Sequence, residues 1–230
     1  MAPPTITGTP VSLSDYFAGG PITVSGYTHA SGDDVYVTVG ASYGLSAAPT
    51  GVTWAGNAMT KIAEVNHGDF ACHASLWRLT ASSTTTGNVV VTLPGGADFV
   101  GTVAVFSGHG VSGLGSAVNL TWTSSTTPSV TLSGDSDSLM LAFGIMRRDG
   151  SDNTLAYFTA SSNGTDIVNT GSSTTGVLYD RAVSFTRAGG ASVAMTLTLA
   201  HASSYGGVLL GIPLQGGGGG GVPLRPWMIG

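Results

Sequence analysis

The chain has 230 residues, of which only 8% are charged, and its formal net charge is −5. This length can hold one large all-β domain or two small ones. Seven basic residues scattered along an acidic chain form no phosphate-binding stripe, and no apolar run reaches the ~20 residues that span a bilayer, so we expect neither a nucleic-acid nor a membrane partner.

The first 21 residues contain three prolines and predict an irregular N-terminal arm. From residue 22 onward, short β-type runs recur, and Gly, Asn, Asp, Ser or Pro punctuates nearly every gap. The predicted strands are 22–27, 35–39, 52–54, 58–65, 73–79, 88–93, 99–107, 130–132, 139–146, 155–159, 177–186, 192–199 and 206–214. No amphipathic helix is predicted. We therefore expect an all-β protein, an antiparallel β-sandwich of jelly-roll or immunoglobulin-like type, with residues 22–215 forming one domain that folds by itself.

Two local features support this pattern. The segment Trp-Ala-Gly-Asn-Ala at 54–58 predicts a tight hairpin, because Gly-Asn supplies the positive φ that such turns require. Three Ser/Thr-rich segments, 82–87, 124–128 and 172–176, are similar only in composition, so we infer no internal repeat from them.

The C-terminal segment predicts a means of attachment. Six glycines at 216–221 form a flexible tether, and an apolar peptide with two prolines follows at 222–230. We expect this peptide to dock on a partner protein, since aromatic and apolar anchors dominate interfaces. The expected docking residues are Val222, Leu224, Arg225, Trp227, Met228 and Ile229.

Two motifs suggest enzyme chemistry without the structural context that the chemistry needs. The G-x-S-x-G segment at 40–44 places Ser42 where a nucleophile elbow would, but no helix is predicted after it. The G-x-G-x-x-G segment at 108–113 likewise precedes no helix that could bind a pyrophosphate. We interpret both as glycine-framed turns and expect no catalytic residue and no cofactor.

A metal site and a carbohydrate platform are two further hypotheses. His67, Asp69 and His73 are close in sequence, but residues 68 and 69 are typical of a loop, so we expect no metal. Trp54 and Trp77 are predicted to be core residues. The candidate glycan contacts are an exposed Trp122 together with Tyr43 and Tyr205.

Five segments, 51–61, 75–79, 86–93, 101–108 and 205–212, resemble a β-sandwich module found in tailed-phage virion proteins and in large bacterial surface proteins. The resemblance covers residues 22–215 and carries no enzymatic residues. This chain differs from the module's other occurrences in having a single copy, an N-terminal arm and a glycine-tethered tail.

We therefore expect a virion structural or accessory protein: a capsid decoration, head-fibre or tail-associated subunit. It would be assembled in the host cytoplasm, bound to other virion proteins, self-associated, and released by lysis. The alternative is a glycan-binding host-adhesion module. A hydrolase is a third, more distant hypothesis.

Overall fold

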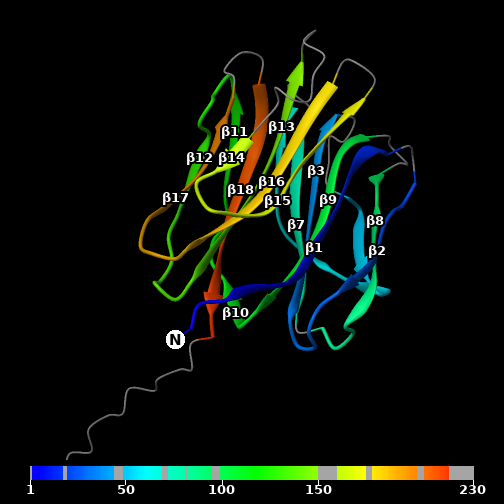
Figure 1. Cartoon of the computed structure of the whole chain (residues 1–230), viewed down its shortest axis with the longest axis vertical. Coiled ribbons are helices and arrows are strands. Elements are labelled where there is room, and N and C mark those ends of the chain that lie inside the picture. The colour runs from blue at the N-terminus through cyan, green and yellow to red at the C-terminus, as the bar shows by residue number, and fades with distance from the viewer. Residues whose placement is uncertain are drawn as a thin grey trace, which may run out of the picture.

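The computed structural model describes residues 2–17, 20–43, 49–68, 72–80, 82–94, 99–149, 160–174, 178–200 and 205–217. Antiparallel strands form nearly all of the regular structure in these residues, which confirms the expected all-β sandwich class. Among them, no helix is long and apolar enough to cross a membrane. The sheets are stacked in layers, from β2 and β8 at the right of Figure 1 to β12 and β17 at the left.

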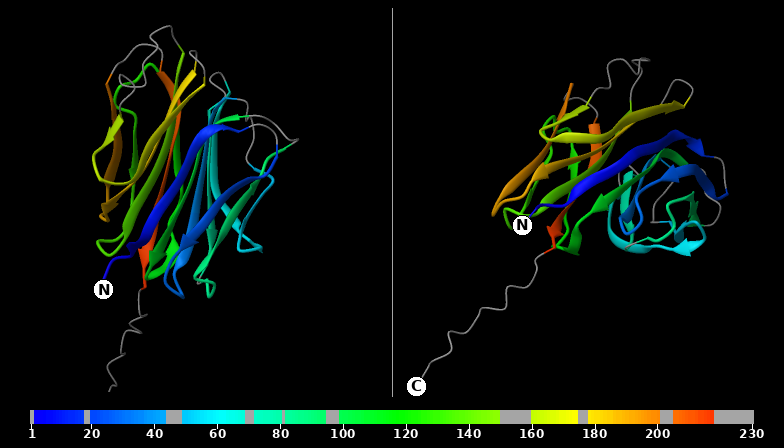
Figure 2. Two further views of the ribbon diagram at one scale, coloured as in Figure 1. Left: turned by 45° about the vertical axis from the view of Figure 1, so that its right-hand side comes forward. Right: turned by 60° about the horizontal axis from the view of Figure 1, so that its bottom comes forward.

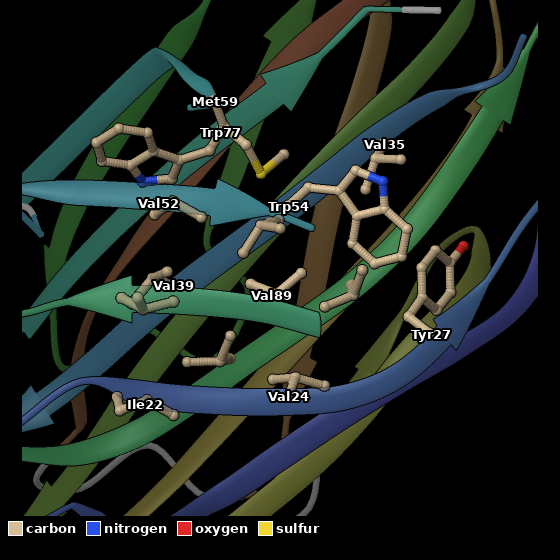
Figure 3. Close-up of a cluster of buried hydrophobic side chains, with 14 of the residues drawn as sticks. Ile22, Val24, Tyr27, Val35, Val39, Val52, Trp54, Met59, Trp77 and Val89 are labelled. Carbon is tan, nitrogen blue, oxygen red and sulfur yellow. The ribbon is translucent and has the colours of Figure 1, made fainter. Parts of the chain in front are cut away.

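The first sandwich comprises β1 to β9. Its inner sheet has the order β1-β9-β3-β7-β6, and its outer sheet has the order β2-β8-β4-β5. Valines and both tryptophans of this half fill the space between the two sheets (Figure 3), as expected for Trp54 and Trp77. The strands are β1 (Thr5–Phe17), β2 (Ile22–Thr28), β3 (Asp34–Tyr43), β4 (Gly51–Trp54), β5 (Asn57–Ala58), β6 (Thr60–His67), β7 (Cys72–Leu79), β8 (Thr86–Thr92) and β9 (Phe99–His109).

The second sandwich comprises β10 to β18. Its inner sheet has the order β10-β18-β13-β16-β15, with β11 also paired to β18, and its outer sheet has the order β12-β17-β14. The strands are β10 (Val111–Leu114), β11 (Val118–Thr123), β12 (Ser129–Leu132), β13 (Leu139–Asp149), β14 (Ala160–Ser162), β15 (Thr165–Thr174), β16 (Leu178–Ala188), β17 (Val193–Leu199) and β18 (Tyr205–Gly216).

The two sandwiches have the same topology. In both, the chain crosses repeatedly from one sheet to the other. The strand order of the first half becomes that of the second when β1 is matched to β10 plus β11, β2 to β12, β3 to β13, the β4–β5 hairpin to β14, and β6–β9 to β15–β18 in turn. This repeated crossing between facing sheets is jelly-roll connectivity. The expectation of a single sandwich over residues 22–215 is therefore wrong: the body is a tandem of two.

Strand registers and sequence support this duplication. In β6, a bulge between Lys61 and Ala63 lies opposite Trp77 and Leu76 of β7. In β15, a bulge between Asp166 and Val168 lies at the matching place opposite β16. Matched strands also carry similar segments: VSLS at 11–14 and VNLT at 118–121, ITVSG at 22–26 and VTLSG at 130–134, TKIA at 60–63 and TDIV at 165–168, and VVVTL at 89–93 and VAMTL at 193–197.

The two inner sheets pack against each other in a reciprocal arrangement. Strand β1 lies against β15, β3 against β13, and β6 against β11, so each edge strand meets the counterpart of the opposite edge. This reciprocity is that of a twofold-symmetric dimer, contained here in one chain. The sheets are in close contact at Gly40, where an added Cβ would lie 2.6 Å from Cζ of Phe143 and 2.9 Å from Cδ1 of Ile145.

The expected irregular N-terminal arm is also wrong. Residues 5–17 form β1, an edge strand that pairs with β9 through its whole length apart from a register shift between Thr7 and Val11. Pro10 lies in this shift, and an edge strand tolerates proline there because the missing N–H breaks no ladder bond. The Thr7 hydroxyl donates to Oδ2 of Asp33 at 2.6 Å and ties the strand to the rest of the sandwich.

Two of the three turns predicted from the sequence are present in the structure, and the third is not. Trp54 and Asn57 close the predicted hairpin, although the residues with positive φ are Ala55 and Gly56 rather than Gly-Asn. Gly110, with a φ of 74°, separates β9 from β10 and confirms a turn in the G-x-G-x-x-G segment. The G-x-S-x-G segment, in contrast, is not a turn: residues 40–43 belong to β3.

Candidate functional site

A pocket of about 900 Å³ lies where the first sandwich meets β11 of the second. Strands β6 and β7 supply most of its wall, the segment before β4 closes one side, and β11 closes another. The volume is in the range of small-molecule sites. The lining residues are Pro49, Thr50, Lys61, Glu64, Val65, Asn66, His73, Trp77, Asn119 and Thr121.

The position of the pocket follows from the strand registers. Lys61 pairs with Trp77 and Asn66 pairs with His73, and paired residues of antiparallel strands share a face of the sheet. Strand β6 is the edge of the inner sheet, and Pro49 and Thr50, just before β4, line the pocket on this side. Asn119 of β11 completes the wall because β11 packs beside β6.

His73 is the unusual group of the pocket. Its side chain is 1% exposed, and neither ring nitrogen has a hydrogen-bond partner among the described residues. Burial lowers the pKa of His73 from 6.5 to about 4, while nearby Glu64 raises it and Lys61 lowers it. The ring is therefore neutral near pH 7 and offers one N–H donor and one nitrogen acceptor.

The charges at the mouth of the pocket balance. Nζ of Lys61 donates to Oε2 of Glu64 at 2.9 Å, and both side chains are partly exposed. Asn66, Asn119 and Thr121 are exposed and add amide and hydroxyl groups around the opening. The pocket thus combines one ion pair, Lys61 with Glu64, with neutral polar groups.

The equivalent positions of the second sandwich are occupied differently. By the matching registers, Arg181 corresponds to His73, Asn169 to Glu64, and Asp166 to Lys61. There Nε of Arg181 donates to Oδ1 of Asn169 at 2.7 Å, and Nδ2 of Asn169 donates to Oδ2 of Asp166 at 2.8 Å. These three side chains are linked by hydrogen bonds, whereas the ring of His73 in the first sandwich has no such partner in the described residues.

A second polar cluster of the first sandwich is internally satisfied. Buried Asp33 accepts hydrogen bonds from Thr7 and from Nδ1 of His109, the latter at 2.8 Å. Asp34 accepts from Arg78, with 2.8 Å between Nε and Oδ2, and from the Tyr36 hydroxyl. Burial raises the pKa of Tyr36, which keeps this hydroxyl a donor. We assign these groups a structural role in tying β1 and the start of β3 to the sheet.

Trp122 is not the exposed ring that glycan stacking requires. It is 6% exposed and belongs to the core of the second sandwich, packed against Gly207, where an added Cβ would lie 2.5 Å from the indole. Tyr43 and Tyr205 lie in β3 and β18, but their side chains are outside what the structure describes. The pocket residues Asn119 and Thr121 precede Trp122 on β11, and they were missed because nothing in the sequence links β11 to β6.

The histidines proposed for a metal site do not converge. His73 pairs with Asn66 and lines the pocket, whereas His67 pairs with Cys72 and points to the opposite face, where its Nε2 lies 3.3 Å from Oγ1 of Thr123. No cluster of three or more metal-ligating side chains occurs within the described ranges, which exclude Asp69. The docking peptide and the side chain of Ser42 also lie outside the described residues.

Comparisons of the chain with protein families, with characterised proteins and with solved structures find no match.

Proposed function

We propose that the protein is a structural or accessory subunit of a phage-like particle: a capsid decoration, head-fibre or tail-associated protein. Jelly rolls recur in viral capsid and lectin domains, which supports the proposal by analogy of fold. The low charge of the chain suits a subunit with close neighbours. Its partners would be other virion proteins, its location the virion, and we expect it to self-associate.

The observation that carries the proposal is the position of the chain ends. The start of β1 and the end of β18 lie at the same pole of the molecule (Figure 2). The N–H of Gly217 donates to the carbonyl oxygen of Gly110 at 3.1 Å, so the chain leaves the body beside the junction of the two sandwiches. A peptide anchored beyond this point would hold the body by one pole and present the other outward.

The test is incorporation of tail variants into particles. Deletion of residues 222–230, or Trp227→Ala, should leave the circular dichroism of the body unchanged and reduce the amount of protein in purified particles. Burial of a large apolar side chain contributes about 1.5–3 kcal/mol, so the single substitution should weaken docking by tenfold or more, roughly. Arg225→Gln serves as a milder control, because a rim charge affects affinity less. Undiminished incorporation of the tail-less chain would contradict the proposal.

A second candidate function, glycan binding in host adhesion, is favoured by one specific observation, the polar pocket beside β6. It does not compete with the first, since one subunit of a particle can serve both. Glycan binding by the purified protein, without any particle, is the measurement that separates the two.

A further inference from the structure

We infer that the pocket formed by β6, β7 and β11 binds a neutral saccharide, with His73 and Asn119 among its contacts. This inference rests on the second candidate function, glycan binding, and is independent of attachment to a particle. It replaces the contacts expected from the sequence, since the buried Trp122 offers no stacking face.

The first argument is the unpartnered imidazole. A buried polar group without a hydrogen bond costs about 1–3 kcal/mol, so His73 is held in an unfavourable state by the protein alone. A neutral imidazole needs one acceptor for its N–H and one donor for its other nitrogen. A sugar hydroxyl is both a donor and an acceptor and can serve either nitrogen.

The second argument is the charge balance of the pocket. Because Lys61 and Glu64 are paired at 2.9 Å, neither leaves a net charge for an ionic ligand to neutralise. The other polar side chains that line the pocket are the amides of Asn66 and Asn119 and the hydroxyls of Thr50 and Thr121, and the Thr50 hydroxyl also donates to the carbonyl oxygen of Thr92. Neutral donors and acceptors that come from β6, β11 and the segment before β4 suit a ligand with hydroxyls pointing in several directions.

The third argument comes from within the chain. The second sandwich has matching strands and a matching bulge in β15. Its equivalent side chains, Arg181, Asn169 and Asp166, are hydrogen-bonded to one another. Ser162 adds a further hydrogen bond to Asp166. The fold therefore does not require an unpartnered ring at this position. In the first sandwich the ring nitrogens of His73 have no hydrogen bond from the described residues, whereas Arg181 at the equivalent position has one.

The experiment uses the full-length chain labelled with ¹⁵N, titrated with glucose, galactose, mannose, N-acetylglucosamine and, as the charged arm, N-acetylneuraminic acid. A glycan array identifies longer ligands for the same titration. We expect a neutral sugar to shift the amide signals of Asn66, Asn119 and Thr121 and the indole signal of Trp77. Asn119→Ala should weaken binding about tenfold, the loss of roughly one neutral hydrogen bond.

Ser12→Ala is the matched control, because Ser12 occupies on β1 the position that Asn119 occupies on β11 and lies outside the pocket. It should bind as the unaltered chain does. Signal changes confined to another surface, or binding of only the charged sugar, would overturn the inference about this pocket while leaving glycan binding standing. Absence of binding to every sugar and to the array would overturn both, whatever the result of the particle experiment.

Discussion

Acidification should destabilise the protein through His73, and substitution of this residue should remove that part of the pH dependence. The pKa of the buried ring is about 4, against 6.5 for an unperturbed imidazole. Between these values the unfolded chain binds a proton that the folded protein excludes, so the free energy of unfolding falls as the pH falls through this window. At about 1.4 kcal/mol per pH unit, the difference between the two pKa values corresponds to a loss of roughly 3 kcal/mol in the free energy of unfolding. This loss is complete only below about pH 4.

Urea unfolding of the full-length protein and of His73→Asn, from about pH 7.5 to about pH 4, isolates this contribution. Other titrating groups affect both proteins equally. The difference between their free energies of unfolding should therefore change by roughly 3 kcal/mol across the range, because only the protein with His73 loses this contribution at low pH. Histidine NMR gives the pKa directly, and Glu64→Gln should lower it further, because Glu64 raises it. Parallel stability curves, or an imidazole at position 73 that titrates near 6.5, would refute the reasoning.

Two further predictions concern packing. Gly40→Ala should destabilise the protein by about 1–3 kcal/mol through overpacking against Phe143, whereas Gly51→Ala, with no atom within 4 Å of an added Cβ, should be neutral or slightly stabilising; urea unfolding of both variants gives the comparison. Deletion of residues 1–21 should lower the melting temperature or prevent folding, because it removes β1 and leaves buried Asp33 without Thr7; a truncated protein as stable as the full chain would restore the idea that residues 22–215 suffice.

Strands with strong alternation could be predicted from the sequence, and weakly apolar edge strands could not. Residues 130–132 and 139–146 alternate or run continuously apolar because they are buried, and they lie in β12 and β13 as expected. Strand β1 contains Pro10 and mostly polar residues, since an edge strand needs fewer buried side chains and can bulge around a proline. Strand β15 ends in the run Asn-Thr-Gly-Ser-Ser-Thr and is likewise an edge.

The duplication was present in the sequence but is not periodic. The segment at 22–26 and its counterpart at 130–134 are 108 residues apart, whereas 60–63 and 165–168 are 105 apart and 89–93 and 193–197 are 104 apart. Turns of different length therefore hide the repeat from any fixed spacing. A comparison of strand faces, rather than of Ser/Thr-rich loops, is the signal that reveals it.

The candidate site could not be predicted, because its walls come from distant parts of the chain. His73 is identifiable as a polar residue in an apolar strand, but its burial without a partner depends on tertiary packing. Asn119 faces β6 only because the inner sheets pack reciprocally, and no local pattern encodes that packing.

Because the two matched sandwiches lie in one polypeptide, a residue of one can change without the equivalent residue of the other changing. In a homodimer every substitution occurs twice, so a destabilising change is doubled and a new side chain is introduced in both subunits at once. Here position 73 carries histidine while its counterpart at 181 carries arginine, and neither choice constrains the other. Each half can therefore specialise under separate selection.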